Sequence, residues 1–351
     1  MTTYKRKLNC MSASTSGLPF DDIRALMKMM PGPDYEAIDA VTQRDKELVK
    51  PAGALGRLED IVLWVAGWQG KGKPTCQRPL VAIFAGDHGV TKHGVSPYPQ
   101  SVTRQMLDTF SAGGAAINQI CASYDLGLKV FDLAIGMPTG DITVEAAMDE
   151  QTAAATIAFG MEAIAGGTDL LILGEMGIGN TTIAASIYNA LYGGKASDWA
   201  GRGTGIDDAG LLRKTAVIER AVHFHKAHFN DPLEVLRRLG GREIAALCGA
   251  ILAARLQRIP VILDGYVVTA AAAILYALDK SSLDHCIAGH VSSEGAHALV
   301  LEKIGLKPIL NLNMRLGEGS GAALAAGIVK AAITCHCDMA TFGQAKVDSK
   351  N

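Results

Sequence analysis

Residues 169–186 have the sequence DLLILGEMGIGNTTIAAS, which predicts a strand, a glycine-rich loop and a helix in direct succession. The apolar run at 169–173 is short and continuous, as is typical of a strand buried on both faces of a parallel sheet. The loop at 174–182 leads into an alanine-rich segment that favours a helix. We therefore expect a strand–loop–helix unit of the kind that builds parallel α/β sheets.

The same succession recurs five or six times along the chain. Further short apolar runs, each followed by a polar or glycine-rich loop, lie at 80–85, 128–133, 260–263, 286–288 and 309–312. This pattern predicts a doubly wound α/β fold with a mostly parallel sheet, whose ligands gather at the carboxyl ends of the strands. The spacing is too irregular for eight equal units, so a β/α barrel is the weaker alternative.

Composition excludes several classes of protein. Of 351 residues, 49% are hydrophobic and 19% charged, which excludes a mainly disordered chain. The 33 lysines and arginines against 35 acidic residues give a net charge of −2, which argues against a general nucleic-acid binder. No apolar run reaches the ~18 residues of a membrane helix, and no signal peptide is visible. Seven scattered cysteines predict reduced thiols in a cytoplasmic protein.

Two groups of possible metal ligands lack the usual spacing. His223, His225 and His228 lie on one predicted helix without an i,i+4 pair, and a solvated helix face is the better interpretation. The cluster 335–337, Cys-His-Cys, has no second pair of ligands. We therefore predict no metal site. His88, after the strand at 80–85, is expected to be a buried histidine that donates to a carbonyl.

The loop GEMGIGNTT is a candidate anion site. Gly177 and Gly179 allow the backbone to approach a ligand closely, and the following helix start offers N–H groups. Asn180 and Thr181 add amide and hydroxyl donors. The alternative is a turn that needs glycines only for its geometry.

A second glycine-rich loop, GRGTG at 201–205, precedes a helix that carries Lys214. A lysine near such a loop suits a phosphate, although a single lysine is more often a solvated surface charge.

The stretch RLGEGSGAALA at 315–325 places Glu318 between two glycines, just before an apolar helix. A carboxylate in a loop at a strand end suits a general base, although the helix dipole could stabilise it in a purely structural role. The segment also matches the dinucleotide fingerprint, with Asp338 about 20 residues further on. Only a short tail follows Asp338, so no second half-sheet can form. A nicotinamide-dinucleotide oxidoreductase is therefore a disfavoured alternative.

Several motifs together resemble one family, the nicotinate-nucleotide:dimethylbenzimidazole phosphoribosyltransferases of cobamide lower-ligand synthesis. They are GRLE (56–59), DHGV (87–90), GEMGIGNTT (174–182), LDGY (263–266), GHVSSEGA (289–296) and RLGEGSGAALA (315–325). The resemblance extends from Leu18 to Asp338. It implies a Rossmann-like catalytic domain at 76–319 and a small helical domain from 18–75 plus 320–351, after a flexible leader at 1–17.

The resemblance also implies a reaction. Phosphoribose passes from nicotinate mononucleotide to an aromatic acceptor, which yields an α-riboside phosphate and nicotinate, without cofactor or metal. Glu318 matches the family's general base and Glu175 a second pocket acid. The phosphate and ribose would be held by Gly177, Gly203, Lys214, Ser292 and Ser293, and nicotinate would meet Asn180 and Thr181.

Departures from the family pattern concern the acceptor pocket, which we assign to Tyr98, Met106, Met176 and Leu316. Tyr98 and Met106 stand where typical members have serine and glutamine, and Met176 replaces leucine. These changes favour a single small ring and resemble the branch that uses phenol or p-cresol, whose members form heterodimers of paralogous chains. Otherwise a homodimer is implied, with active sites near the subunit interface.

Three alternatives remain open for the acceptor and the role of the chain. The acceptor could be 5,6-dimethylbenzimidazole, and the loop at 94–103 could be shifted by one or two residues relative to the family. The chain could also be a non-catalytic partner subunit, but it retains Glu318 and each glycine-rich loop.

Overall fold

The computed structural model describes residues 18–348 and contains one six-stranded sheet in which all neighbouring strands are parallel. The strands are β1 (Pro79–Ala85), β2 (Gly127–Asp132), β3 (Leu170–Met176), β4 (Val261–Leu263), β5 (Cys286–His290) and β6 (Pro308–Leu310). Their order is β2-β1-β3-β4-β5-β6, so the chain reverses direction across the sheet between β1 and β3. The predicted doubly wound parallel sheet is confirmed. Ligands in such sheets bind outside the carboxyl ends of the strands, near this reversal.

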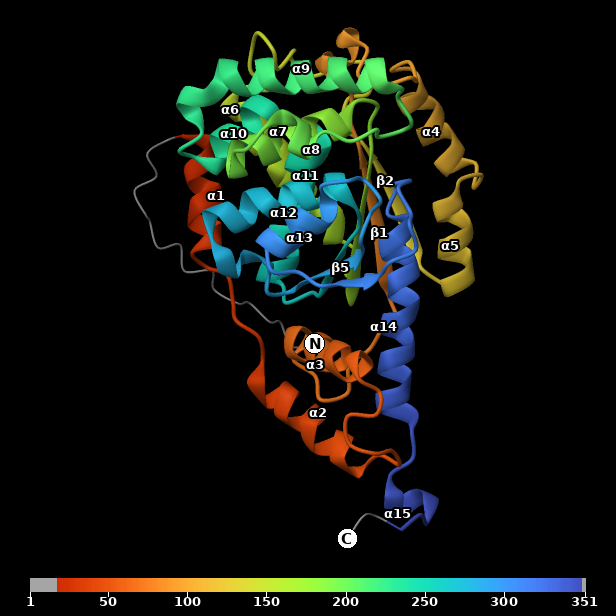
Figure 1. Cartoon of the computed structure of the whole chain (residues 1–351). Coiled ribbons are helices and arrows are strands. Elements are labelled where there is room, and N and C mark those ends of the chain that lie inside the picture. Colours follow the sequence, from red (N-terminus) through yellow and green to blue (C-terminus); the bar gives the residue numbers. More distant parts are fainter. Residues whose placement is uncertain (1–17, 349–351) are drawn as a thin grey trace, which may run out of the picture.

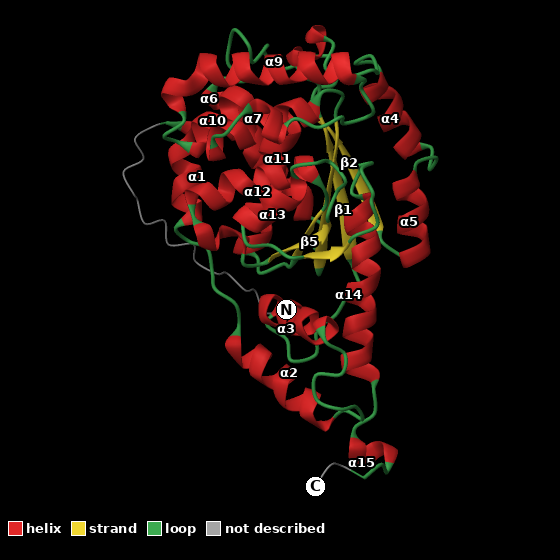
Figure 2. Cartoon of the chain, in the orientation of Figure 1, coloured by secondary structure: helices red, strands yellow, loops and turns green. Residues whose placement is uncertain are grey.

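Helices cover both faces of the sheet (Figure 1, Figure 2). They are α1 (Pro19–Met27), α2 (Tyr35–Glu47), α3 (Arg57–Gln69), α4 (Val102–Ser111), α5 (Ala116–Tyr124), α6 (Glu150–Met161), α7 (Asn180–Tyr192), α8 (Ala196–Trp199), α9 (Asp208–His225), α10 (Pro232–Leu239), α11 (Arg242–Leu256), α12 (Tyr266–Leu278), α13 (His297–Lys303), α14 (Ser320–Asp338) and α15 (Phe342–Ala345). Four short 3-10 turns, η1 (Gly89–His93), η2 (Glu162–Ile164), η3 (Lys226–His228) and η4 (Lys280–Leu283), complete the described elements.

Alternation along the central strands produces two cores. In β1, Ala82 and Phe84 join the larger cluster with α6, α7, α11 and α12, whereas Val81 and Ile83 join the cluster with α3, α5 and α14. Successive side chains of a strand point to opposite faces, so a strand buried on both sides must be apolar throughout. This explains why the strands appear in the sequence as continuous apolar runs.

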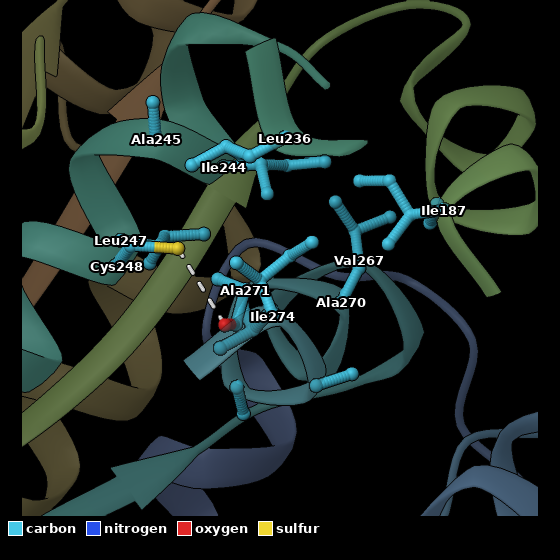
Figure 3. Packing of buried hydrophobic residues seen from close by; sticks show 14 of the residues in the cluster. Ile187, Leu236, Ile244, Ala245, Leu247, Cys248, Val267, Ala270, Ala271 and Ile274 are labelled. Carbon is cyan, nitrogen blue, oxygen red and sulfur yellow. Dashed lines mark hydrogen bonds between the residues drawn. The ribbon is translucent and has the colours of Figure 1, made fainter. Parts of the chain in front are cut away.

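Small residues let the helices of the larger core pack closely. A methyl group on Gly160 of α6 would lie 1.9 Å from the carbonyl oxygen of Ala246, and one on Gly249 of α11 would lie 1.8 Å from that of Ile157. Figure 3 shows the neighbouring contact of α11 with α12, where the Cys248 thiol lies 3.5 Å from the Ala271 carbonyl oxygen. The high glycine and alanine content therefore reflects backbone-to-backbone packing as well as loops.

The elements α2, α3, α15 and the C-terminal half of α14 lie together below the sheet (Figure 1). Arg44 of α2 donates to the carbonyls of His336 and Cys337 at the end of α14. In contrast, α1 packs against α6, and its Arg24 pairs with Asp231. The first helix thus packs beside α6, although we expected it in the small helical domain. The expected leader at 1–17 lies outside the described residues.

We expected no segment long and apolar enough to cross a membrane, but helix α14 is an exception. By length and composition it qualifies, alone among the helices of residues 18–348. However, 56% of its apolar window is buried inside the fold, against α3, α5 and β5, as is typical of a core helix.

The described cysteines are free thiols, and Cys10 lies outside residues 18–348. Within those residues, no group of three or more histidine, cysteine or acidic side chains is placed to hold a metal ion. His225 is fully buried rather than solvated, with its Nε2 3.0 Å from the Ile142 carbonyl oxygen. The interpretation of its helix face as solvated was therefore wrong at this residue.

Candidate active site

A cleft lies at the carboxyl ends of β3 and β5. It is formed by loops that are far apart in the sequence but meet there because the strands are parallel. The lining residues are Val95, Ser96, Glu175, Met176, Gly177, Ile178, Gly179, Asn180, Thr181, Gly203, Thr204, Gly265, Tyr266, Val267, His290, Ser292, Glu294, Arg315, Leu316, Gly317 and Glu318. Both proposed acids and all three glycine-rich motifs thus contribute to one site.

Glu318 has an unusual backbone conformation. Its φ is +63°, and the neighbouring Gly317 and Gly319 have φ of +83° and +77°. A non-glycine residue in this region is strained, and such strain is concentrated at functional sites. The turn packs directly on β3, since a methyl group on Gly174 would lie 2.5 Å from the Gly319 nitrogen. The strained turn therefore places the Glu318 carboxyl in the cleft on a rigid support.

Asp264, which follows β4 and is fully buried, holds this turn from the other side. Its two oxygens accept hydrogen bonds from the backbone nitrogens of Gly319, at 3.1 Å, and Ala322, at 2.9 Å. A carboxylate at the N-terminus of α14 is stabilised by the unpaired N–H groups and the helix dipole. Burial, and secondly the negative charge of Asp264, raise the pKa of Glu318 to about 7. Near neutral pH the Glu318 carboxyl can therefore accept a proton or release one.

Glu175, at the end of β3, lies against the same turn. A methyl group on Gly317 would be 2.6 Å from its Oε1, and the Asn180 side chain donates a hydrogen bond to its other oxygen. Burial, followed by the charges of Asp264, Glu243 and Glu318, raises the pKa of Glu175 to about 8. Two neighbouring buried carboxyls resist ionising together, and with its raised pKa Glu175 is mostly protonated at neutral pH.

Lys214 of α9 is fully buried, which excludes its interpretation as a solvated surface charge. Its Nζ donates to Thr181 Oγ1 and to the Gly201 carbonyl oxygen, both at 2.8 Å. Burial lowers the pKa of Lys214 to about 8, against the opposing effect of the Glu294 carboxylate. This lysine joins the loop at 177–181 to the loop at 201–205, although it is not itself among the residues that line the cleft.

Most of the predicted binding residues lie together. Those that line the cleft are Gly177, Asn180, Thr181, Gly203, Ser292, Met176 and Leu316. Ser293 is exposed and is not among the lining residues; its backbone nitrogen donates to the Met314 carbonyl oxygen at 2.9 Å. Ser293 thus connects two of the loops rather than facing the cleft.

The placement of Tyr98 and Met106 differs from expectation. Tyr98 is 52% exposed in the segment between η1 and α4, and Met106 of α4 packs against the core cluster with α3 and α5. Neither lines the cleft, where Val95 and Ser96 lie instead. Of the three departures that favoured a small acceptor ring, only Met176 lines the cleft. A serine two residues before Tyr98 thus lines the cleft, which agrees with the alternative of a shifted loop.

Sequence reasoning missed several residues that shape the site. Asp264 and Glu294 occur in quoted motifs, but only the fold shows what they contact. His88 was expected to donate to a carbonyl; instead its Nε2 lies 3.0 Å from Glu243 Oε1, and both side chains are fully buried. This pair lies directly behind the cleft, since a methyl group on Gly177 would be 3.0 Å from the same nitrogen.

Comparison with known proteins decides the family. A family model described as a phosphoribosyltransferase matches residues 30–347. Relatives named nicotinate-nucleotide–dimethylbenzimidazole phosphoribosyltransferase occur in Agrobacterium fabrum, 65% identical over 96% of this chain and 98% of the relative, and in Rhizobium johnstonii, 65% identical over 96% and 100%. The chain belongs to this phosphoribosyltransferase family.

The family assignment extends to the fold. The crystal structure of CobT from Thermus thermophilus matches with a TM-score of 0.83 at 39% identity, covering 90% of this chain and 100% of that chain. The chain is accordingly a pentosyltransferase, as the resemblance implied. None of these relatives is named for a phenolic acceptor, so the phenol branch has no support from them.

Proposed function

We propose that this phosphoribosyltransferase transfers the 5-phosphoribosyl group of nicotinate mononucleotide to 5,6-dimethylbenzimidazole and releases nicotinate. The observation that carries the proposal is the 65% identity, over nearly the full length, to relatives named for this reaction. The cleft supports it, because a buried acid with a pKa near neutrality faces loops suited to bind a phosphate.

The bond changes require one base. The glycosidic bond to the pyridinium nitrogen breaks, and its electron pair stays with nicotinate, whose ring nitrogen becomes neutral without a general acid. A benzimidazole nitrogen attacks the anomeric carbon, and the proton on the other ring nitrogen must leave. Glu318 accepts that proton, because a carboxyl with a pKa near neutrality is effective as a general base.

The other residues position the substrates. Glu175 keeps a proton at neutral pH and holds the Asn180 side chain, so that Asn180 and Thr181 are placed to meet nicotinate. The backbone of Gly177 and Gly203, with Lys214 and Ser292, would bind the phosphate and ribose. Positioning and charge placement of this kind supply much of the rate enhancement in group transfer.

A phenolic acceptor is the second candidate. It rested on Tyr98, Met106 and Met176, of which only Met176 lines the cleft. The heterodimer was tied to the phenolic branch and loses its basis with it, so we propose that the chain is active without a paralogous partner. A dinucleotide oxidoreductase has no support from the family assignment.

The experiment is incubation of the purified chain with nicotinate mononucleotide and a mixture of 5,6-dimethylbenzimidazole, phenol and p-cresol, with products identified by mass. We expect the dimethylbenzimidazole α-riboside phosphate to dominate. A dominant cresyl or phenyl riboside phosphate would establish the second candidate. No riboside phosphate from any acceptor would contradict the proposed function and the activity of the chain alone.

A further inference from the structure

Glu294, in the loop between β5 and α13, occupies an unexpected position in the cleft. Its carboxylate is 6% exposed and accepts from the Gly203 backbone nitrogen at 3.2 and 3.1 Å. Its Oε1 also lies 3.8 Å from Lys214 Nζ. These are the donors that the proposed function assigns to the substrate phosphate, and here they surround a carboxylate of the protein itself.

The charge of Lys214 explains why an anion is needed there. The other groups that bind its ammonium are a threonine hydroxyl and a backbone carbonyl, both neutral. A buried charge without a counter-charge is strongly destabilising, and Glu294 is the acid that pairs with Lys214 within the described part of the chain. The site therefore contains an anion of the protein itself.

The surrounding backbone fits closely around this anion. A methyl group on Gly201 would lie 2.0 Å from Glu294 Oε1. On the opposite side of the loop, Arg315 Nη1 donates to the Gly203 carbonyl oxygen at 2.8 Å. The loop at 201–205 is thus held from both sides, and its N–H group points to the carboxylate as it would to a phosphate oxygen.

We propose that Glu294 is an internal substitute for the substrate phosphate: its carboxylate occupies the phosphate position when no substrate is bound and leaves when phosphate binds. The inference rests on the proposed function for the location of the phosphate. Two anions cannot share the Gly203 nitrogen and Lys214 without strong repulsion. Glu294 lies in the turn between β5 and α13, where its backbone donates to Ser292 Oγ and accepts from the His297 nitrogen, so a rotation of the side chain alone withdraws the carboxylate. Glu294 thereby keeps the phosphate loop ordered while competing with the substrate.

The first test measures binding of inorganic phosphate by calorimetry at constant ionic strength, for the natural enzyme, Glu294→Gln and Glu302→Gln. Glu302 is exposed on α13, so its change alters net charge equally without touching the cleft. Glutamine can still accept from the Gly203 nitrogen but carries no charge. We expect Glu294→Gln to bind phosphate about tenfold more tightly or better, because a competing charge is removed. Glu302→Gln should bind as the natural enzyme does.

Kinetics separate competition from a merely structural role. Glu294→Gln should lower KM for nicotinate mononucleotide and should not raise kcat, because the competing charge affects binding and not the chemical step. Unchanged or weaker phosphate binding by Glu294→Gln, or no saturable phosphate binding by either protein, would overturn the inference.

A second variant keeps the test decisive if Glu294→Gln does not fold. Gly201→Ala places a methyl group where the carboxylate now lies, and its other short contacts are also to the end of the flexible Glu294 side chain. It should fold but lose phosphate binding, because the same space must receive the phosphate. A folded Gly201→Ala with normal phosphate binding would overturn the inference. If the phosphate pattern holds but no acceptor yields product, the proposed function fails and the inference stands.

Discussion

Glu318 combines three features that seldom occur together by chance: a left-handed backbone, burial, and a second buried carboxylate, Asp264, beside its turn. The left-handed backbone and the burial of Glu318 both lower the free energy of unfolding, the backbone conformation alone by on the order of 1–3 kcal/mol. Asp264 offsets part of that cost by accepting two backbone hydrogen bonds. The result is a carboxyl whose pKa lies where proton transfer at neutral pH requires it.

The pH dependence of the reaction follows from this pKa. Because Glu318 must be ionised to accept a proton, kcat/KM for the acceptor should rise as the pH increases through about 7 and then level off. Because Glu175 lies in the same charge environment, the apparent pKa of this rise in kcat/KM describes the two carboxyls together and not Glu318 alone. A steady-state profile between about pH 5 and pH 9 checks this. A profile that is flat across neutral pH would contradict the role of Glu318.

The raised pKa of Glu175 leads to a separate prediction about how the stability of the protein depends on pH. Its pKa is about 8 in the folded protein against an ordinary value of 4.5, so between these values the unfolded chain releases a proton that the folded chain retains. Stability is therefore lost as the pH rises through this range. Glu175→Gln should remove the loss, and its Tm should exceed that of the natural protein by on the order of 5 °C at pH 8 but little at pH 4.5. Thermal melts at both pH values check this, and equal differences at both would contradict it.

At the scale of elements, helices α6 and α11 are held by direct backbone contact through Gly160 and Gly249. The apolar pattern of the sequence predicted both helices but not their closeness. A glycine inside a helix lowers the stability of that helix by about 1 kcal/mol relative to alanine. The sequence alone does not show what compensates for this, because the compensation depends on the neighbouring helix. The fold supplies the reason, because any side chain there would collide with a carbonyl oxygen.

Gly249→Ala tests this packing. The added methyl would lie 1.8 Å from the Ile157 carbonyl oxygen, so the helices must separate, at a cost of about 1–3 kcal/mol or more. Gly343→Ala makes the same change in α15, in open space, and should be neutral or slightly stabilising. Denaturant unfolding of both variants provides the comparison. Equal stability of the two would show that the helix contact is not tight.

The strands and loops could largely be predicted from sequence for a simple reason. Buried parallel strands are continuous apolar runs, and the loops after them carry the glycines and acids. This pattern pointed to the loop at 201–205 and to Glu318 as separate candidates, and the family resemblance added Glu175; the structure brings all three into one cleft. The same pattern could not predict the positions of Tyr98 and Met106. The position of Tyr98 depends on the path of the segment between η1 and α4, and that of Met106 on which face of α4 is buried.

Contacts between distant segments were also invisible in the sequence. Glu243 and His88 are 155 residues apart, and Glu294 and Gly203 are 91 apart, so no local pattern pairs them. From its sequence context alone, Lys214 was consistent with a solvated surface charge, but in the fold its side chain is fully buried. In each case the decisive fact is which loops the sheet order brings together.

At the scale of the whole molecule, the near-neutral charge and the glycine-rich loops have one explanation. Loops from six segments meet at one edge of the sheet, where a few placed donors, and not a basic surface, face the ligand. The relatives match nearly the full length of the chain, so the family resemblance includes α2, α3 and α14 as well as the sheet and its loops (Figure 1).

The central claim is that this cleft transfers phosphoribose with Glu318 as the base. The most direct test is nicotinate release from nicotinate mononucleotide and 5,6-dimethylbenzimidazole by the natural enzyme, Glu318→Gln and Glu219→Gln, an exposed control on α9. We predict that Glu318→Gln binds nicotinate mononucleotide normally but loses about 10²- to 10⁴-fold in kcat, whereas Glu219→Gln is unaffected. A Glu318→Gln enzyme with a near-normal kcat would contradict the claim.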